Sequence, residues 1–141
     1  MPLKLSLKPG ERFVVNGAVL QNGDRRAVFL LQNKASILRE KDIIQPEDVT
    51  TPARRVYFPI MMMYLDPAEA NRFFDEFVLR LNEFMSVIGS TEVLKECVSL
   101  SREIMAADYY KALTRCRKLL NYEQGLLGNV DPSLPEHGEE D

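Results

Sequence analysis

The chain has 141 residues, of which 45% are hydrophobic and 28% charged, the balance of an ordinary soluble globular protein rather than a disordered or fibrous one. Residues 1–60 hold ten Lys and Arg against six Asp and Glu, whereas residues 61–141 hold eight against fifteen. No segment approaches the roughly 20 apolar residues of a membrane-spanning helix, and the N-terminal segment has no apolar block of signal-peptide length, so a cytoplasmic location without membrane contact is expected.

Residues 1–50 are predicted to form a small antiparallel β part. Leu3, Leu5 and Leu7 alternate with polar residues until Pro9-Gly10 breaks the run and starts a hairpin. Branched and aromatic residues predict further strands, separated by the turn signals Asn16-Gly17 and Asn22-Gly23-Asp24, at residues 13–15, 18–21 and 27–32.

Residues 51–128 are predicted to be helical. Residues 53–65 fit a helix that Pro59 kinks, or a strand that ends before this proline. The methionines at 61–63 and their aromatic neighbours are interpreted mainly as core between sheet and helices, with a partner-docking groove as the alternative. Arg54 and Arg55 either cap carbonyls and pair with acids or extend a basic surface.

Later helices are predicted from capping signals and apolar spacing. Asp66 as the N-cap and Pro67 as the first helical residue begin a helix that ends near Ile88. Ser90 or Thr91 caps the next helix, and another runs from about Asp108 to Tyr122. The middle one of these three helices is expected to present one side formed by Leu94, Cys97, Val98, Ser101 and Met105.

Residues 129–141 contain two prolines, one glycine and five acids with only two large apolar groups, so a disordered acidic tail is predicted. The fold class is therefore predicted to be α+β, with a small antiparallel β N-terminal half followed by a helical C-terminal half and the tail.

Catalysis is not expected from this sequence. His137 lies in the tail, so no Ser/His or Cys/His nucleophile pair is available. Neither GxGxxG nor GxxxxGK[ST] occurs, which argues against a nucleotide cofactor. Cys97 and Cys116 have no neighbouring histidines and are interpreted as helix-packing residues. We predict a non-enzymatic protein with no cofactor and no metal site.

Four segments occur in the order typical of one family: LKLSLKPGERFVVNGAV, VLQNGDRRAVFLLQNKASILREKDI, TPARRVYFPIMMMYLD and ADYYKALTRCRKLLNYE. Over residues 1–128 the chain resembles the FlbT family of flagellar biosynthesis regulators. The resemblance implies a post-transcriptional regulator acting at the 5′ untranslated region of flagellin mRNA, usually by repression and message decay, although some members activate. It also implies FlaF as a partner in the same circuit.

A second resemblance covers residues 5–43, which are similar to the carbon storage regulator CsrA, a family that binds GGA-containing RNA leaders. KPGE stands where that family has KVGE, and ILREKDI resembles the element whose arginine contacts RNA. Carried over by position, Leu5 and Arg39 become candidate RNA contacts, whereas Leu7 replaces an arginine, so RNA specificity is expected to differ. The resemblance also implies a homodimer with swapped strands.

Cations suited to RNA phosphates are spread over the β part. The candidate RNA-binding residues are therefore Lys4, Leu5, Lys8, Arg25, Arg26, Lys34, Arg39 and Lys41. Each cation also fits an ordinary surface charge. The competing interpretation is an adaptor or chaperone-like protein, whose acidic helical half binds FlaF or flagellin and affects mRNA indirectly.

Overall fold

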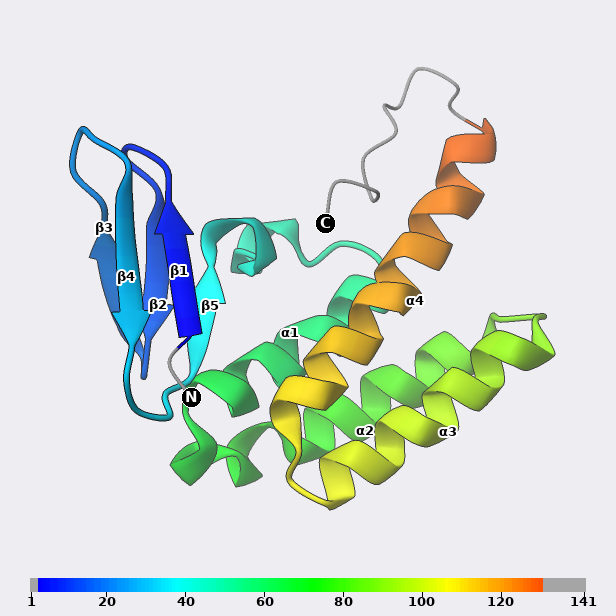
Figure 1. Cartoon of the computed structure of the whole chain (residues 1–141). Helices are drawn as coiled ribbons and strands as arrows, with labels where there is room; N and C mark the ends of the chain where they lie inside the picture. The colour runs from blue at the N-terminus through cyan, green and yellow to red at the C-terminus, as the bar shows by residue number, and fades with distance from the viewer. Residues whose placement is uncertain (1–2, 131–141) are drawn as a thin grey trace.

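The computed structural model describes residues 3–130 and consists of a β half followed by a helical half (Figure 1). This confirms the predicted α+β class. The five strands are β1 (Leu3–Leu7), β2 (Arg12–Val15), β3 (Ala18–Gln21), β4 (Ala27–Leu31) and β5 (Ile37–Arg39). The four α-helices are α1 (Pro52–Leu65), α2 (Asn71–Ser86), α3 (Thr91–Met105) and α4 (Tyr109–Val130).

The strands form two antiparallel sheets rather than one. β1 pairs with β4, and the second sheet has the order β3-β2-β5. The predicted hairpin at Pro9-Gly10 is therefore wrong, because the strands that this turn joins belong to different sheets. The hairpin at Asn16-Gly17 is confirmed: it joins β2 to β3, and its φ angles of 50° and 85° are those of a tight turn that matches the strand twist.

Strand β2 is buried on both faces, which explains its continuous apolar run. Phe13 packs with Leu5 and Leu7 in a small core between the two sheets. Val14 points to the opposite face, where it joins Leu38 of β5 in the main core with the helices. The β3-β2-β5 sheet is thus the middle layer between the β1-β4 sheet and the helical half.

Helix α1 runs through Pro59, so the alternative of a strand ending there is wrong. The Thr51 hydroxyl accepts from Arg54 N at 3.3 Å, and Pro52 occupies the first turn, where a missing N–H costs little. Glu123 of α4 adds a second cap, since its Oε2 accepts from Ala53 N at 2.9 Å. These caps, together with burial, offset the bond that Pro59 removes.

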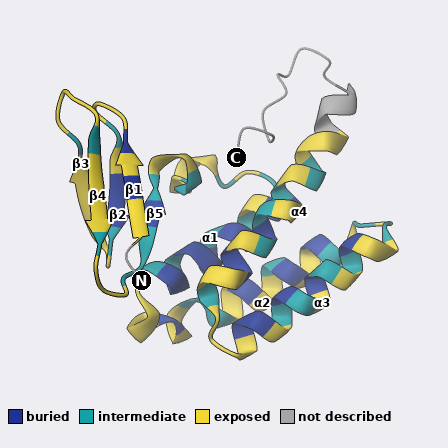
Figure 2. Cartoon of the chain, viewed as in Figure 1, coloured by how far each residue is buried: buried dark blue, intermediate teal, exposed yellow. Residues whose placement is uncertain are grey.

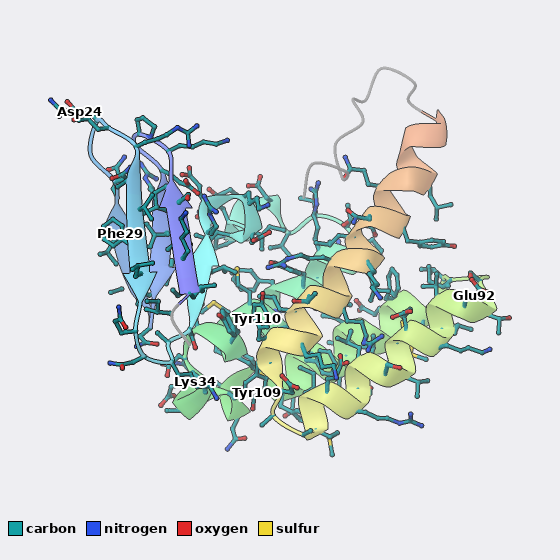
Figure 3. The ribbon with its side chains drawn as sticks, viewed as in Figure 1. Asp24, Phe29, Lys34, Glu92, Tyr109 and Tyr110 are labelled. Carbon is teal, nitrogen blue, oxygen red and sulfur yellow. The ribbon has the colours of Figure 1, made fainter. Side chains whose placement is uncertain are left out.

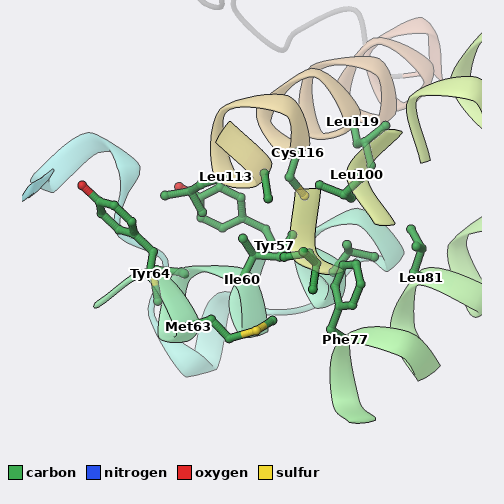
Figure 4. Packing of buried hydrophobic residues seen from close by; sticks show 14 of the residues in the cluster. Tyr57, Ile60, Met63, Tyr64, Phe77, Leu81, Leu100, Leu113, Cys116 and Leu119 are labelled. Atoms are coloured by element: carbon green, nitrogen blue, oxygen red, sulfur yellow. The ribbon is translucent and has the colours of Figure 1, made fainter. Parts of the chain in front are cut away.

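The main core lies where α1 meets the other helices (Figure 4). Tyr57, Met61, Met63 and Tyr64 are buried there, so the interpretation of the methionine segment as core is confirmed. Cys97 and Cys116 are buried in the same core as free thiols. Burial raises the pKa of both, which keeps them protonated at neutral pH and confirms their packing role.

The predicted helix start at Pro67 is wrong. Pro67–Glu69 is a short 3-10 turn, Asp66 makes no side-chain capping bond, and α2 begins only at Asn71. The predicted end near Ile88 lies two residues beyond Ser86, the last residue of α2. Its buried stripe is formed by Phe77, Leu81 and Phe84.

Helix α3 begins as predicted, with the Ser90 hydroxyl accepting from Val93 N at 3.2 Å. The predicted apolar side is only partly right: Cys97 is buried and Leu94 and Ser101 are half-buried, but Val98 is 45% exposed and Met105 73% exposed. The buried side is instead formed by Val93, Cys97, Leu100, Glu103 and Ile104. Glu103 is paired on this side with Arg115 of α4, whose Nη2 lies 2.8 Å from the Glu103 carboxylate.

Helix α4 continues to Val130, eight residues beyond the predicted end at Tyr122. The predicted disordered tail therefore begins within a helix, and residues 131–141 lie outside the described part. Within the described residues no helix is long and apolar enough to span a membrane. Figure 2 shows the buried residues gathered between the helices, while β3 and β4 are mostly exposed.

Candidate nucleic-acid interface

Three predicted cations gather at one end of the β1-β4 sheet. The register places Leu7 opposite Ala27, so Lys8 follows one strand where Arg26 precedes the other. Arg25 lies in the same loop, and all three side chains are exposed. We call Lys8, Arg25 and Arg26 the basic end.

The side-chain amide of Asn22 holds this end in shape. The Asn22 Nδ2 donates to the carbonyl oxygens of Lys8 at 2.8 Å and Arg25 at 2.9 Å. Asn22 Oδ1 accepts from Gly23 N at 2.9 Å. The backbone of the basic end is therefore organised before any partner arrives, which reduces the entropy lost on binding.

Beside the basic end, the outer face of the β1-β4 sheet mixes one cation with apolar groups. Lys4 lies opposite Leu30, and Ser6 lies opposite Val28, so all four side chains point to the same side. All four residues are exposed. This face offers apolar surface to bases and a cation to a phosphate.

Arg39 is held in an ion pair rather than presented freely to solvent. Its Nε and Nη2 donate to the Glu11 carboxylate at 2.9 to 3.0 Å, and Nη2 also donates to Ser6 O at 2.7 Å. Burial alone would raise the pKa of Glu11, but the hydrogen bond from Lys8 N and the Arg39 guanidinium lower it overall. Arg39 therefore ties β5 to β1 and to the turn before β2.

Leu5 and Lys41 lie apart from the basic end. The Leu5 side chain belongs to the small core and Leu5 is only 8% exposed, so a partner there could meet little more than its backbone. Lys41 is exposed in the short 3-10 helix Glu40–Asp42, which follows β5. The structure therefore brings together three of the eight predicted residues, with Lys4 on the adjoining face.

A groove of about 670 Å³ lies where the β half meets α1 and α4. Lys34, from the loop after β4, and Tyr110, from α4, both line this groove, and both are labelled in Figure 3. Leu3 and Leu5 provide apolar lining from β1. Tyr110 is 57% exposed, and its ring centroid lies 5.6 Å from that of Tyr64.

Arg117 of α4 also lines the groove, although sequence reasoning did not single it out. Its Nη2 lies 3.3 Å from Asp42 Oδ2, and its buried Nε has no hydrogen-bond partner among the described residues. The Tyr57 hydroxyl donates to Asp42 O at 2.6 Å. Arg117 lies in ADYYKALTRCRKLLNYE, so that family-typical segment was the available signal.

Two further predictions concern chemistry. Arg54 donates from Nη1 to Asp48 O at 3.3 Å, which confirms the carbonyl-capping interpretation for this residue. Within residues 3–130, no group of three His, Cys, Asp or Glu is placed to hold a metal ion. The described part thus presents a small α+β protein whose candidate site is a cationic and apolar β surface beside a groove.

Comparisons with known proteins agree with the family motifs. Residues 3–127 match the family model described as flagellar protein FlbT. The chain is 60% identical over 139 residues to the flagellum biosynthesis repressor protein FlbT of Caulobacter vibrioides, covering 99% of each chain. A probable flagellum biosynthesis repressor of Bradyrhizobium diazoefficiens is 35% identical over 137 residues, covering 96% of this chain and 92% of that one.

This chain therefore belongs to the FlbT family. No solved structure matches it. The likeness of residues 5–43 to CsrA accordingly stays a prediction that rests on the sequence motifs.

Proposed function

We propose that this protein regulates flagellum biosynthesis in the cytoplasm by binding the 5′ untranslated leader of flagellin mRNA. Binding represses translation by covering the ribosome-binding site and promotes decay of the message. The names of its relatives, which are flagellum biosynthesis repressors, support the regulatory part of this proposal.

The observation that carries the RNA part is the basic end beside an exposed apolar sheet face. Single-stranded RNA is bound where cations meet phosphates and splayed bases meet flat apolar or aromatic groups. Lys8, Arg25 and Arg26 provide the cations, while Val28 and Leu30 provide the apolar surface.

The groove extends this surface in the direction of the strands. A five-residue strand spans roughly 16 Å, so β1 and β4 lead from the basic end toward Lys34. There Tyr110 offers an exposed ring for a base, and Lys34 offers a cation. Sequence-specific contacts are expected at this second position, because phosphate contacts at the basic end carry no base information.

The test is a titration of the full chain against its own flagellin leader and against a scrambled RNA of equal length, at several salt concentrations. In the test variant Lys8, Arg25 and Arg26 are all replaced by Gln. Each lost phosphate contact should reduce the salt slope by about 0.7, so the triple variant should lose about 2 from the slope and bind more weakly.

A matched control removes three exposed cations from the helical half, by replacing Lys95, Lys111 and Lys118 with Gln. The net charge changes equally, so a difference between the two triple variants reports the place of the charges. Equal weakening by both would mean non-specific attraction, and absence of binding by the unmodified chain would contradict direct leader recognition.

The adaptor function has its own support in the helical half. Helices α2 and α3 expose apolar side chains that a protein partner could cover. They are Val78, Leu79, Val98 and Met105. FlaF or flagellin would bind there, with an indirect effect on mRNA. Co-elution of the chain with purified FlaF or flagellin, in the absence of any RNA shift by the chain alone, would favour this function.

A further inference from the structure

The charges that line the groove between the β half and the helices mostly neutralise one another. The lining includes the cations Lys34, Arg39 and Arg117 and the acid Asp42. Arg117 pairs with Asp42, and Arg39 pairs with Glu11, which lies outside the lining. Lys34 is exposed and has no salt-bridge partner within residues 3–130. The groove therefore suits an occupant with one negative charge rather than a strongly acidic one.

One wall of the groove is aromatic and accessible. Tyr110 of α4 is 57% exposed, and its ring packs beside that of Tyr64 with 5.6 Å between the centroids. Leu3, which is 51% exposed, adds apolar lining from β1. Exposed aromatic rings of this kind are platforms on which planar bases stack.

The pair of Arg117 and Asp42 brings hydrogen-bonding groups of both kinds to the same groove. The Arg117 side chain is 29% exposed and that of Asp42 19% exposed, so an occupant can reach both. A guanidinium only donates, and a carboxylate only accepts. A purely apolar occupant would remove water from both groups without replacing its hydrogen bonds, which is unfavourable. The groove thus favours a flat ring whose edge carries donors and acceptors, as the nucleobases do.

We propose that this groove binds one nucleotide. The base stacks on Tyr110, its edge bonds to Arg117 and Asp42, and the phosphate meets Lys34. The volume of about 670 Å³ lies within the roughly 300–1,000 Å³ of small-molecule sites. A free nucleotide and an unpaired nucleotide of an RNA strand share this chemistry. Where the nucleotide belongs to the leader, the inference rests on the proposed function and identifies its base-reading site.

The first arm of the test is an NMR titration of the full chain with AMP, GMP, CMP and UMP. Backbone amides of residues 35–38, which line the groove, should shift and saturate. Tyr110→Leu removes the flat ring and should weaken binding about tenfold, whereas Tyr110→Phe keeps the ring and should bind as the unmodified chain does. Lys34→Gln should weaken binding about threefold, and less at high salt.

Lys95→Gln is the matched control for the lost charge, since Lys95 is exposed on α3 and does not line the groove. The second arm repeats the leader titration with Tyr110→Leu and Tyr110→Phe. Weaker leader binding by the Leu variant alone, without any binding of mononucleotides, would support the inference and assign the nucleotide to RNA. Circular dichroism establishes that each variant is folded.

The inference is overturned if the two Tyr110 variants do not differ toward either ligand, or if Lys95→Gln weakens binding as much as Lys34→Gln. Its failure is distinguishable from failure of the proposed function. A chain that binds mononucleotides in the groove but not the leader keeps the inference and loses the proposed function. A chain whose leader binding depends on the basic end but not on the Tyr110 ring keeps the proposed function and loses the inference.

Discussion

The ion pair between Arg39 and Glu11 joins three parts of the β half through two side chains. The Arg39 side chain is 32% exposed and that of Glu11 13% exposed, so water screens the pair only in part. A proposed RNA contact at Arg39 must therefore use the exposed part of a guanidinium that is already bound. Replacing Arg39 would confuse loss of a contact with loss of structure, and Glu11 is the better residue for measuring the structural part.

We expect Glu11→Gln to lower the free energy of unfolding at pH 7 by about 1 kcal/mol, because Gln keeps the shape but loses the charge. The folded-state pKa of Glu11 lies below its ordinary value of about 4.3. Its contribution is therefore complete above that ordinary value and is lost as the pH falls through the lowered folded pKa.

Urea unfolding of both proteins at pH 7 and near pH 3 measures this effect. The gap between the two proteins should shrink in acid, whereas Glu47→Gln, at an exposed position, should show no gap at either pH. A gap that stays constant or widens in acid would mean that the ion pair does not contribute as described.

At the scale of the elements, the orientation of α3 is the clearest departure from the sequence pattern. The predicted side has helical spacing and includes Leu94, Val98, Ser101 and Met105. The helix buries Leu100 and Ile104 instead. An amphipathic pattern with a broad apolar face permits either orientation. In the fold, Arg115 of α4 pairs with Glu103 and, at 2.6 Å, with Glu96 of α3, and such a long-range contact has no local signal in the sequence.

This orientation predicts unequal costs for two similar truncations. Leu100→Ala should lower the free energy of unfolding by about 3 kcal/mol, since Leu100 is fully buried and leaves a cavity. Val98→Ala should cost less than about 0.5 kcal/mol, because Val98 is largely exposed. Chemical denaturation of the two variants measures both losses of stability. Equal losses would contradict an orientation of α3 that buries Leu100 and exposes Val98.

Other elements followed directly from local chemistry. The Asn16-Gly17 hairpin and the Ser90 cap were predictable, because each depends on residues adjacent in sequence. The pairing of β1 with β4 was not, since turn signals at Pro9-Gly10 say that the chain reverses but not which strand it meets. The basic end was missed as a group for the same reason: Lys8 and Arg26 meet only through that pairing.

At the scale of the whole molecule, the Tyr64 hydroxyl connects the two halves. It accepts from Ile37 N and donates to Ile37 O, each at 2.8 Å, so one residue of α1 satisfies both backbone groups of β5 at that position. The hydroxyl also stands beside the groove. Its removal should loosen the β half against the helices without opening the core.

We expect Tyr64→Phe to lower the free energy of unfolding by about 1 to 2 kcal/mol, because two backbone groups lose their partner. Amide exchange at Ile37 should accelerate more than exchange in α2. Tyr110→Phe is the control, since its ring lies beside that of Tyr64 but is exposed. Hydrogen exchange read by NMR distinguishes the variants, and unchanged protection at Ile37 would show that the hydroxyl does not hold the junction.

Because β2 is buried on both faces, the β half and the helical half are not expected to fold separately when the chain is truncated. Phe13 belongs to one core and Val14 to the other, so neighbouring side chains of a single strand are anchored in both halves. A recombinant fragment ending at residue 50 would expose Val14 and Leu38 to water. The fragment that remains would lose the part of the main core that these two residues cover. Truncation products are therefore expected to aggregate rather than to report on either half alone.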